Sequence, residues 1–488
     1  MNKNQAPLSV SYKEIYAHAT ELSKPVNLSF EHPVVTEQLL NAIQPVDFRR
    51  LASLEDKEKT SLVVLYVLVI DQVAKLAQQH NWGLCQHDGY AYLYNGQYWL
   101  RWSRDELRQF LCRAASKLGV DDIRSKDHMF VDHLYKQFIV SSPLPAPATS
   151  VGTTLINLLN GTLEINNGKV RKRGHEANDF QTYLLSFDYD PQADCPRFKQ
   201  FLQEVLPDED LQKVLAEFIG WVFMPTTLLK LEKCLILHGT GANGKSVFFD
   251  IIFALLGSNN ITCISLRNLC DSVGQYRARL SGKLLNYSTE LSAGLETDLF
   301  KQLASGEPIE ARQLYKEPYT VSNYARLMFN TNELPKQVEQ SEGYYRRFII
   351  IPFLVTIPED EQDKQLAQNI IAQELPGILN WVLEGAQRLL AQKRFTVSES
   401  VNLQTEQFRR DSDSTALFLQ EEGYTQDPHE HLTVKELYIH YEQYCHECRN
   451  KPVSRNNFFK RLEAQGVRFK RTSKGQEAFL KKPVTAES

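Results

Sequence analysis

A glycine-rich segment that ends in lysine and serine is the part of this chain best suited to chemistry. The segment fits the pattern G-x-x-x-x-G-K-[ST] and consists of Gly239, Thr240, Gly241, Ala242, Asn243, Gly244, Lys245 and Ser246. Backbone N–H groups of such a loop close around phosphate oxygens, and the N-terminus of the following helix adds positive potential. Lys245 is the expected contact of the β- and γ-phosphates, and Ser246 is the expected magnesium ligand. These residues predict a nucleotide site.

The residues on either side of this segment supply the strand and the helix that a phosphate-binding loop requires. The five residues before it read CLILH, a short apolar strand, and KSVFFDIIFALL has a helical pattern that Gly257 stops. From Leu235 to about Phe353, strand-like runs alternate with helices, which is typical of a parallel sheet. An ordinary glycine-rich turn is the alternative, and this context makes it the weaker one.

Hydrolysis at such a site also needs an acid, a polar sensor and a cation. Glu290 ends the candidate strand GKLLNYSTE, Asn330 and Asn332 end the strand RLMFNTN, and Arg346 and Arg347 precede the strand FIIIPF. Because the carboxyl ends of parallel strands line one crevice, we expect these residues to converge there. The alternatives are a surface carboxylate, a turn residue and a solvated pair of charges.

Five stretches of the chain, in this order, resemble the superfamily 3 helicases of phages and plasmids: NGKS, GKLLNYSTE, LASGEPIEARQLY, NTNELP and YYRRFIIIPF. The similarity is greater to the helicase half of phage–plasmid primase-helicases, which are related to the poxvirus primase-helicase. Upstream, NLLNGTLEI and FDYDPQADCPRFKQFLQEVLP resemble the small domain that precedes that helicase core. The resemblance extends over residues 85 to 485.

The resemblance implies an AAA+-like P-loop core that binds ATP and Mg²⁺. It implies that Glu290 is the acidic residue of the second motif and a magnesium ligand, and that Asn332 orients the attacking water. It also implies that Arg346 or Arg347 is an arginine finger, which acts on the ATP of a neighbouring subunit. Such a finger implies a homo-oligomeric ring, usually a hexamer in this family.

The second motif departs from the family pattern, which often carries two acids spaced as E-x-E. Here Glu290 is followed by Leu291 and Ser292, so Glu290 serves alone or with help from Glu296 or Asp298. The strand before it is also unusually polar, because Asn286 stands where an apolar residue is expected.

Two segments carry the residue types that bind DNA. The family's channel hairpin corresponds to the segment from Gly306, where Arg312 and Lys316 could contact phosphates and Tyr315 could stack on a base. An exposed hairpin with these residues for solubility is nearly as good an interpretation.

The second segment is the C-terminal one, which is strongly basic. Residues 451–482 hold ten Lys or Arg and two acids, a balance of +8 in a chain whose net charge is −4. A helix capped by Ser454 and a hairpin around Lys474 and Gly475 predict a winged helix. The expected DNA contacts are Arg455, Lys460, Arg461, Lys470 and Arg471. A basic protein-docking module is the alternative.

Composition and segment boundaries complete the expectations. The chain of 488 residues predicts a helical region at 1–80, an α+β domain at 81–225, the ATPase core at 226–395 and the winged helix at 400–488. The apolar run Leu62–Ile70 is too short to span a bilayer and predicts a buried helix, so no membrane is expected. Eight cysteines without small-scaffold spacing predict free thiols in the cytoplasm. Neither the Cys445–Cys448 pair nor Asp188 and Asp190 supplies a convincing metal site.

The leading interpretation is an ATP-dependent DNA helicase that unwinds DNA during replication of a phage, plasmid or mobile island. Its substrate would be single-stranded or forked DNA, and the resemblance implies 3′ to 5′ tracking. A separate primase or another replication protein is a candidate partner. Two alternatives remain open: an origin-binding initiator that melts DNA locally, and an ATP-gated effector of anti-phage defence. The weakened second motif favours both alternatives.

Overall fold

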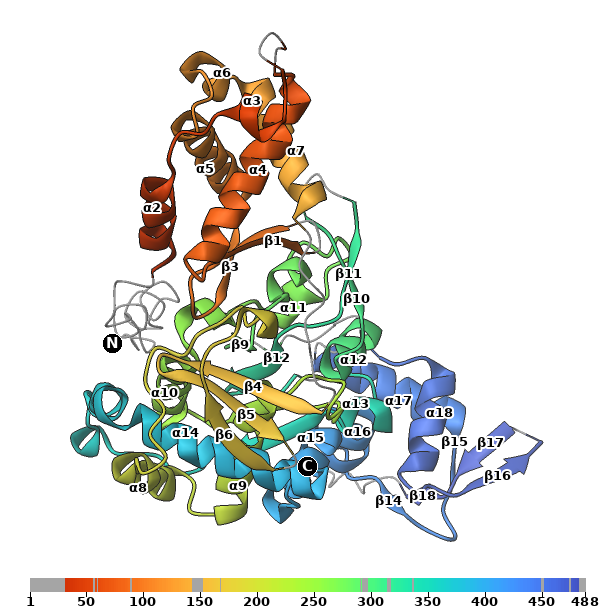
Figure 1. Cartoon of the computed structure of the whole chain (residues 1–488). Helices are drawn as coiled ribbons and strands as arrows, with labels where there is room; N and C mark the ends of the chain where they lie inside the picture. Colours follow the sequence, from red (N-terminus) through yellow and green to blue (C-terminus); the bar gives the residue numbers. More distant parts are fainter. Residues whose placement is uncertain are drawn as a thin grey trace, which may run out of the picture.

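The computed structural model describes most of the chain after residue 30, in segments separated by short gaps. These segments are 31–55, 58, 60–87, 90–142, 152–166, 168–289, 291, 297–313, 317–335, 338–448, 452–473 and 475–481. The described helices and strands form three units along the chain, each with its own hydrophobic core (Figure 1).

The described part of the first unit combines six helices with a three-stranded antiparallel sheet. Its elements are α2 (His32–Ala42), α3 (Phe48–Leu51), α4 (Leu62–Gln79), β1 (Gly83–His87), β2 (Tyr90–Tyr94), β3 (Trp99–Trp102), α5 (Arg104–Lys117), α6 (Asp122–Lys126) and α7 (His128–Ser141). Asn95 and Gly96 lie in the hairpin between β2 and β3, across which Tyr94 pairs with Trp99. One core joins α2 and α4 to the sheet and to α5 and α7, so no boundary between cores falls at residue 80.

The apolar run that begins at Leu62 opens α4, and the prediction of a buried helix is right for only one of its faces. Leu65, Val69 and Ile70 are buried in the first core, whereas the side chain of Val63 is 66% exposed. Among the described residues, α4 is the single helix long and apolar enough to cross a membrane. A helix that packs one face into a protein core can have the same length and composition, so these two properties are weak evidence for a membrane span.

The central unit is built on a five-stranded, fully parallel sheet in the order β13-β7-β12-β9-β8. Its strands are β7 (Cys234–His238), β8 (Ile261–Thr262), β9 (Leu285–Ser288), β12 (Arg326–Thr331) and β13 (Phe348–Pro352). The helices are α8 (Pro196–Val205), α9 (Glu209–Val222), α10 (Lys245–Leu256), α11 (Leu266–Leu269), α12 (Thr297–Ser305), α13 (Glu342–Tyr345), α14 (Leu366–Gln392) and α15 (Glu399–Asp411). The predicted α/β core with a parallel sheet is confirmed.

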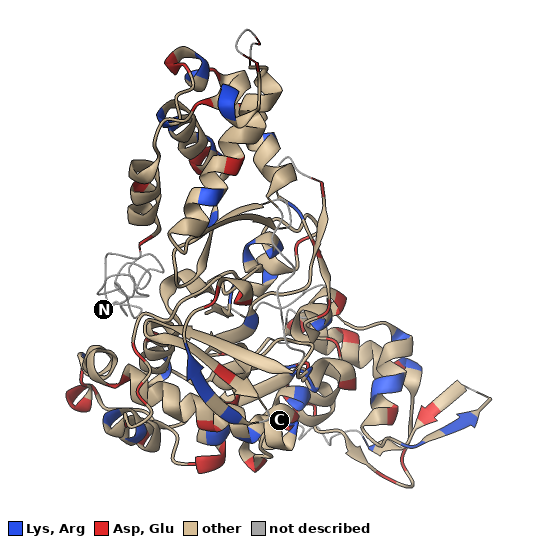
Figure 2. Ribbon diagram, viewed as in Figure 1, with Lys and Arg blue, Asp and Glu red and all other residues tan. Residues whose placement is uncertain are grey.

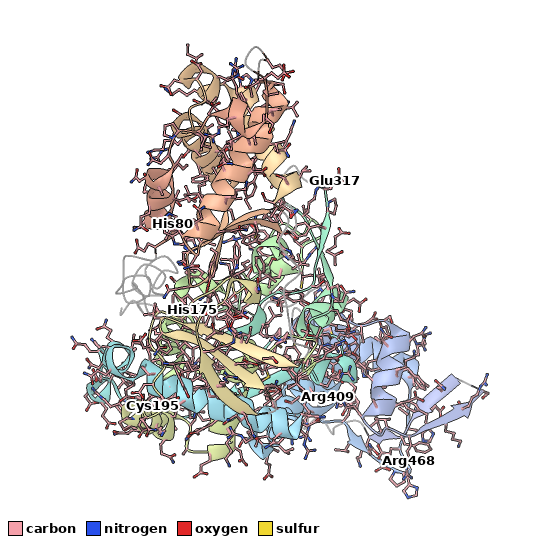
Figure 3. The ribbon with its side chains drawn as sticks, viewed as in Figure 1. His80, His175, Cys195, Glu317, Arg409 and Arg468 are labelled. Carbon is pink, nitrogen blue, oxygen red and sulfur yellow. The ribbon has the colours of Figure 1, made fainter. Side chains whose placement is uncertain are left out.

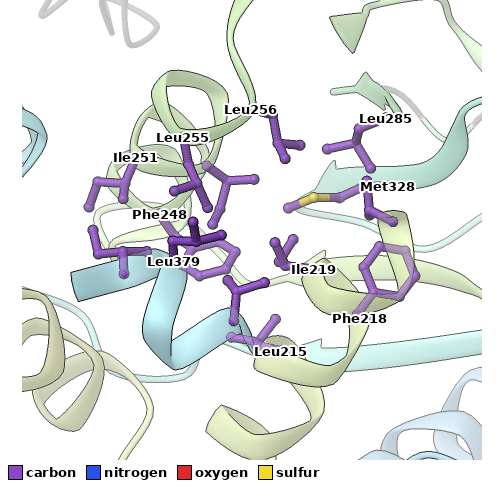
Figure 4. Packing of buried hydrophobic residues seen from close by; sticks show 14 of the residues in the cluster. Leu215, Phe218, Ile219, Phe248, Ile251, Leu255, Leu256, Leu285, Met328 and Leu379 are labelled. Atoms are coloured by element: carbon purple, nitrogen blue, oxygen red, sulfur yellow. The ribbon is translucent and has the colours of Figure 1, made fainter. Parts of the chain in front are cut away.

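Both faces of this sheet are covered, as parallel sheets require. Leu235 and Leu237 of β7 face a core formed with α8, α9, α10 and α14, while Cys234 and Ile236 face one formed with α11, α12 and α13. Figure 4 shows Phe248 of α10 beside Leu379 of α14 in the first of these cores. Because its side chains enter these two cores alternately, β7 is packed between two apolar layers.

A smaller antiparallel sheet adds to the first of these cores. It consists of β4 (Thr153–Leu158), β5 (Gly161–Asn166) and β6 (Lys169–Arg173), in that order. Ile156 and Leu163 of this sheet are buried with α8 and α9. Residues 152–222 therefore belong to the central unit, and the span predicted as one domain at 81–225 divides between two cores on either side of the proline-rich segment 143–150.

The third unit is compact and C-terminal. It contains α16 (Ser414–Glu421), β14 (Thr425–Gln426), β15 (Leu432–Thr433), α17 (Val434–Glu447), α18 (Arg455–Ala464), β16 (Phe469–Thr472), β17 (Gly475–Ala478) and β18 (Leu480–Lys481). The predicted cap is present, because the Ser454 hydroxyl accepts a hydrogen bond from the Asn457 amide. The predicted hairpin is present too, with Thr472 paired to Gly475.

Candidate functional site

The glycine-rich loop connects β7 to α10 with an unusual backbone. Gly241, Ala242 and Gly244 have φ angles of 116°, 49° and 84°, in the left-handed region. At Gly239, a Cβ atom would lie 2.3 Å from the Phe353 carbonyl oxygen, so only glycine fits there. Left-handed residues within a turn direct successive N–H groups into a concave surface that suits an anion. The predicted strand–loop–helix context is confirmed.

Lys245, the first residue of α10, points back into this loop. Its Nζ donates to the Gly239 carbonyl at 2.8 Å and to Asn243 Oδ1 at 2.9 Å, and burial lowers the pKa of the ammonium group. Asn243 is anchored in turn, since its Nδ2 donates to the Phe353 carbonyl at 2.9 Å. Ser246 is exposed in the first turn of α10, and Thr240 is exposed in the loop. The ammonium group is thus held at the mouth of the loop by oxygen atoms of the loop itself.

The strands that flank the loop bring one of the predicted polar residues to the same edge of the sheet. β12 lies between β7 and β9, and Thr331 pairs with His238. Asn332 is therefore exposed next to the start of the loop, whereas Asn330 donates to the Tyr287 hydroxyl at 3.0 Å. β9 ends at Ser288 on this edge; Glu290, two residues further on, lies outside the described residues.

The arginine pair lies at the amino-terminal ends of the parallel strands, away from the loop. Phe348 pairs with Cys234 and Pro352 with His238, so Arg346 and Arg347 precede β13 beside the start of β7. The loop begins five residues further along β7, which is roughly 16 Å at the rise of a strand. The expectation that the arginines converge with the loop within one chain is therefore wrong. The two arginines precede β13 rather than follow it. They therefore lie at the amino-terminal ends of the parallel strands, whereas the loop lies at the carboxyl-terminal ends.

The two arginines also differ in their surroundings. Arg347 is buried, donates to the Gly343 and Lys301 carbonyls and bonds to Ser305 Oγ at 3.0 Å. Arg346 has a side chain that is 56% exposed and pairs with Glu232 at 2.9 Å. The geometry leaves Arg346 as the member of the pair that can reach another molecule.

A cavity of about 510 Å³ opens beside Arg346, and the sequence reasoning did not find it. Besides Arg346, its basic lining residues are Lys233, Arg394 and Arg409. Figure 3 labels Arg409, which comes from α15 and pairs with Glu342 at 2.5 Å. These cations come from segments far apart in the sequence, so no local motif could have signalled them.

A second residue that the sequence reasoning missed is His238, the last residue of β7. Its Nδ1 is buried and has no hydrogen-bond partner in the described part of the chain. Burial and the nearby Lys245 ammonium group lower the pKa of this imidazole, while a hydrogen bond with the side chain of Gln404 of α15 acts to raise it. Its position directly before the glycine-rich loop was the available signal.

The polar residue in β9 that looked out of place is fully satisfied. Asn286 is completely buried, and its Oδ1 accepts from the Thr262 hydroxyl and the Ile264 amide, each at 3.0 Å. Its Nδ2 donates to the Ile264 carbonyl at 2.9 Å. Asn286 therefore ties β9 to the chain that leaves β8, where an apolar side chain would leave those groups unpaired.

The candidate DNA contacts of the central unit lie on an antiparallel hairpin formed by β10 (Ile309–Ala311) and β11 (Tyr319–Val321). Arg312 follows β10 and is exposed. Tyr315 and Lys316 lie outside the described residues. The hairpin extends towards the first unit, and Figure 3 labels Glu317 near its tip.

The basic residues of the C-terminal unit divide into two groups. Arg455, Lys460, Lys470 and Arg471 are exposed on α18 and β16, and Figure 2 shows the basic strand at the edge of the unit. Arg461 is different, because its Nη1 contacts Asp413 Oδ1 at 3.1 Å and its side chain is only 18% exposed. Arg461 is thus engaged within its own unit, whereas the other four are open to solvent.

Comparisons with known proteins match two parts of the chain to described families. Residues 72–207 match the D5 N terminal like family, and residues 237–347 match a family of unknown function, DUF5906. The second match runs from the end of β7 to Arg347, and so contains both edges of the candidate site. Neither match covers half of the chain.

A curated relative is the "Putative helicase L207/L206" of Acanthamoeba polyphaga mimivirus. It is 28% identical over 161 residues, which are 32% of this chain and 17% of the viral protein. About a third of this chain therefore resembles part of a viral protein named as a helicase. Two solved apo structures of the NrS-1 C-terminal region have TM-scores of 0.46 and 0.45 at 13% and 12% identity; they cover 86% and 85% of this chain and 99% of each matched chain.

Proposed function

We propose that this protein is an ATP-dependent DNA helicase of superfamily 3, which acts as a ring in the replication of a phage, virus, plasmid or mobile island. The observation that carries the proposal is the loop between β7 and α10, with the buried Lys245 at its mouth and Asn332 beside it. A related stretch in a viral protein named as a helicase supports the same function.

In this proposal the loop binds the phosphates of ATP. Backbone N–H groups of Gly241 to Gly244 surround the phosphate oxygens, and Lys245 exchanges its two oxygen partners in the loop for the β- and γ-phosphates. Ser246 and Glu290 would hold Mg²⁺, which would supply positive charge to the phosphate oxygens. Asn332 positions the attacking water at the end of β12.

The position of the arginines makes hydrolysis a property of the assembly. Arg346 lies about a strand length from the loop of its own chain, so it can serve only the site of a neighbour. In a ring each subunit contributes the loop to one interface and Arg346 to the next. Hydrolysis by an isolated chain would then be slow, because the transition-state charge lacks its guanidinium group.

DNA contact is assigned to the hairpin β10–β11 and to the C-terminal unit. The order of β15, α17, α18, β16 and β17 supports a winged helix, in which α18 would enter a groove and β16 would approach the DNA backbone. Arg455, Lys460, Lys470 and Arg471 would then contact phosphates.

A strand-displacement experiment on forked DNA tests the proposal. We expect ATP- and Mg²⁺-dependent displacement of a short duplex, with a 3′ tail preferred over a 5′ tail. ATP turnover without displacement of even short duplexes would instead support an initiator that melts DNA locally. The single acid of the second motif favours that second candidate. Absence of ATP turnover in the assembled protein would contradict both.

A further inference from the structure

The outer sheet of the first unit has a second face that the proposed function does not use. Side chains of β2 alternate, so Ala91 and Leu93 enter the helical core while Tyr90 and Tyr92 face the other way. Arg101 of β3 pairs with Tyr92 and shares that face. This face is turned towards the central unit, whose Tyr319 on β11 forms a hydrogen bond with Tyr90.

Aromatic and basic side chains from five separate segments meet at this junction. The Arg101 guanidinium lies over the Tyr90 ring, 3.3 Å from its centroid. Burial lowers the pKa of Lys283, just before β9, and the nearby charges of Arg101 and of Arg279, in the 3-10 helix Arg277–Leu280, lower it further. Arg101 and Arg279 are exposed, and Tyr90, Tyr319 and Lys283 are half-buried.

Like charges that converge in this way repel one another, and a bound anion would offset that repulsion. Burial and the two arginines each disfavour the charged form of Lys283, whose Nζ donates a hydrogen bond to the Asn259 carbonyl. On the hairpin, Glu310 pairs with Thr320 and so points to the face opposite Tyr319. Glu317, two residues before Tyr319 and near the hairpin tip, is acidic and exposed.

We propose that Arg101, Arg279, Lys283, Tyr90 and Tyr319 form a binding site for single-stranded nucleic acid at the junction of the first and central units. The cations bind backbone phosphates, and the stacked guanidinium and the tyrosine rings offer planar surfaces to unpaired bases. A duplex keeps its bases stacked on one another and cannot use these surfaces. The site deepens the proposed function, because it would hold a single strand where the hairpin meets the first unit.

The experiment compares full-length variants in binding a fluorescent oligothymidylate over a range of salt concentrations. We expect the Arg101→Ala/Arg279→Ala variant to bind about tenfold more weakly or worse, with a salt slope reduced by about 1.4 for two lost phosphate contacts. The control Arg124→Ala/Lys136→Ala removes two exposed cations from α6 and α7 and should bind as wild type does. Tyr319→Ala should weaken binding, whereas Tyr319→Phe, which keeps the ring, should not.

Wild-type affinity and slope in a folded Arg101→Ala/Arg279→Ala variant would overturn the site. An equal loss of affinity for a duplex of the same length would overturn its preference for single strands. ATP turnover without DNA, measured in parallel, separates this inference from the proposed function. If turnover is absent, the helicase proposal fails; if turnover is normal but the variants bind as wild type does, only this site fails.

Discussion

The Lys245 ammonium group lies 2.9 Å from Asn243 Oδ1, two residues before it in the same loop. A second oxygen, the Gly239 carbonyl, lies 2.8 Å away on the other side. The lysine is therefore pre-positioned by its own loop, and phosphate binding requires only that it changes partners. Because Asn243 is itself fixed by the Phe353 carbonyl, the loop is braced against β13.

Lys245→Ala should abolish ATP turnover, with a loss of at least about 100-fold. The variant removes the cation that offsets charge on the β- and γ-phosphates. Steady-state phosphate release by the assembled protein is the measurement. The Lys245 ammonium group bonds to oxygen atoms of the loop itself, so the fold outside the loop should survive, and an unchanged melting temperature is the control. Normal turnover would mean that the loop is not the nucleotide site.

Arg346→Ala and Arg347→Ala should fail in different ways. Arg346→Ala should lose turnover but keep nucleotide binding and stability, because its side chain is exposed and pairs only with Glu232 among the residues described. Arg347→Ala should lower the free energy of unfolding by about 3 kcal/mol, since buried carbonyl and hydroxyl groups lose their donor. Nucleotide binding and urea unfolding of both variants distinguish these outcomes.

Mixing Arg346→Ala subunits with Lys245→Ala subunits should restore part of the activity. Some interfaces would then combine an intact loop from the first variant with an intact Arg346 from the second. Turnover is measured as a function of the mixing ratio, after mixed assemblies have been verified by pull-down of a tagged subunit. No recovery in verified mixed assemblies would contradict the shared site.

Asn286→Ala should lower the free energy of unfolding by about 2 to 3 kcal/mol. The change leaves the Thr262 hydroxyl and the Ile264 amide and carbonyl buried without partners. Thr262→Val removes a single hydrogen bond of this network and should cost less, about 1 kcal/mol. Chemical denaturation of both variants tests the order, and equal stability of Asn286→Ala and wild type would contradict the role assigned to Asn286.

Stability of the first unit should fall as the pH decreases from 7 towards 4. Burial lowers the pKa of His32 to about 4, against backbone hydrogen bonds that act in the opposite direction. The unfolded chain, in which the pKa is about 6.5, then binds more protons between these two values. The stabilisation present above pH 6.5 is therefore lost as the pH falls to 4, by up to about 3 kcal/mol. His32→Gln should flatten this dependence in urea unfolding measured across that range; an unchanged slope would contradict it.

The sequence predicted the features of this protein that depend on neighbouring residues. The strand, loop and helix around Lys245 follow from glycine placement and hydrophobic pattern, and so do the capped helix at Ser454 and the hairpin at Thr472. The parallel sheet followed from alternating strands and helices. The place of Asn332 beside the loop followed because strands that point the same way end on the same edge.

Tertiary structure decided the features that depend on strand order and on contacts between distant segments. Pairing of β13 with β7 places Arg346 on the edge opposite the loop, and burial separates Arg347 from it; two adjacent arginines in a sequence carry neither distinction. The sharing of the first core across residue 80 likewise arises from packing of α4 against α7 and β1, and Arg101 meets Lys283 and Tyr319 from more than 100 residues away in the chain. Hydrophobic periodicity tells which face of an element is buried, but the partner that buries it is selected only when the whole chain has folded.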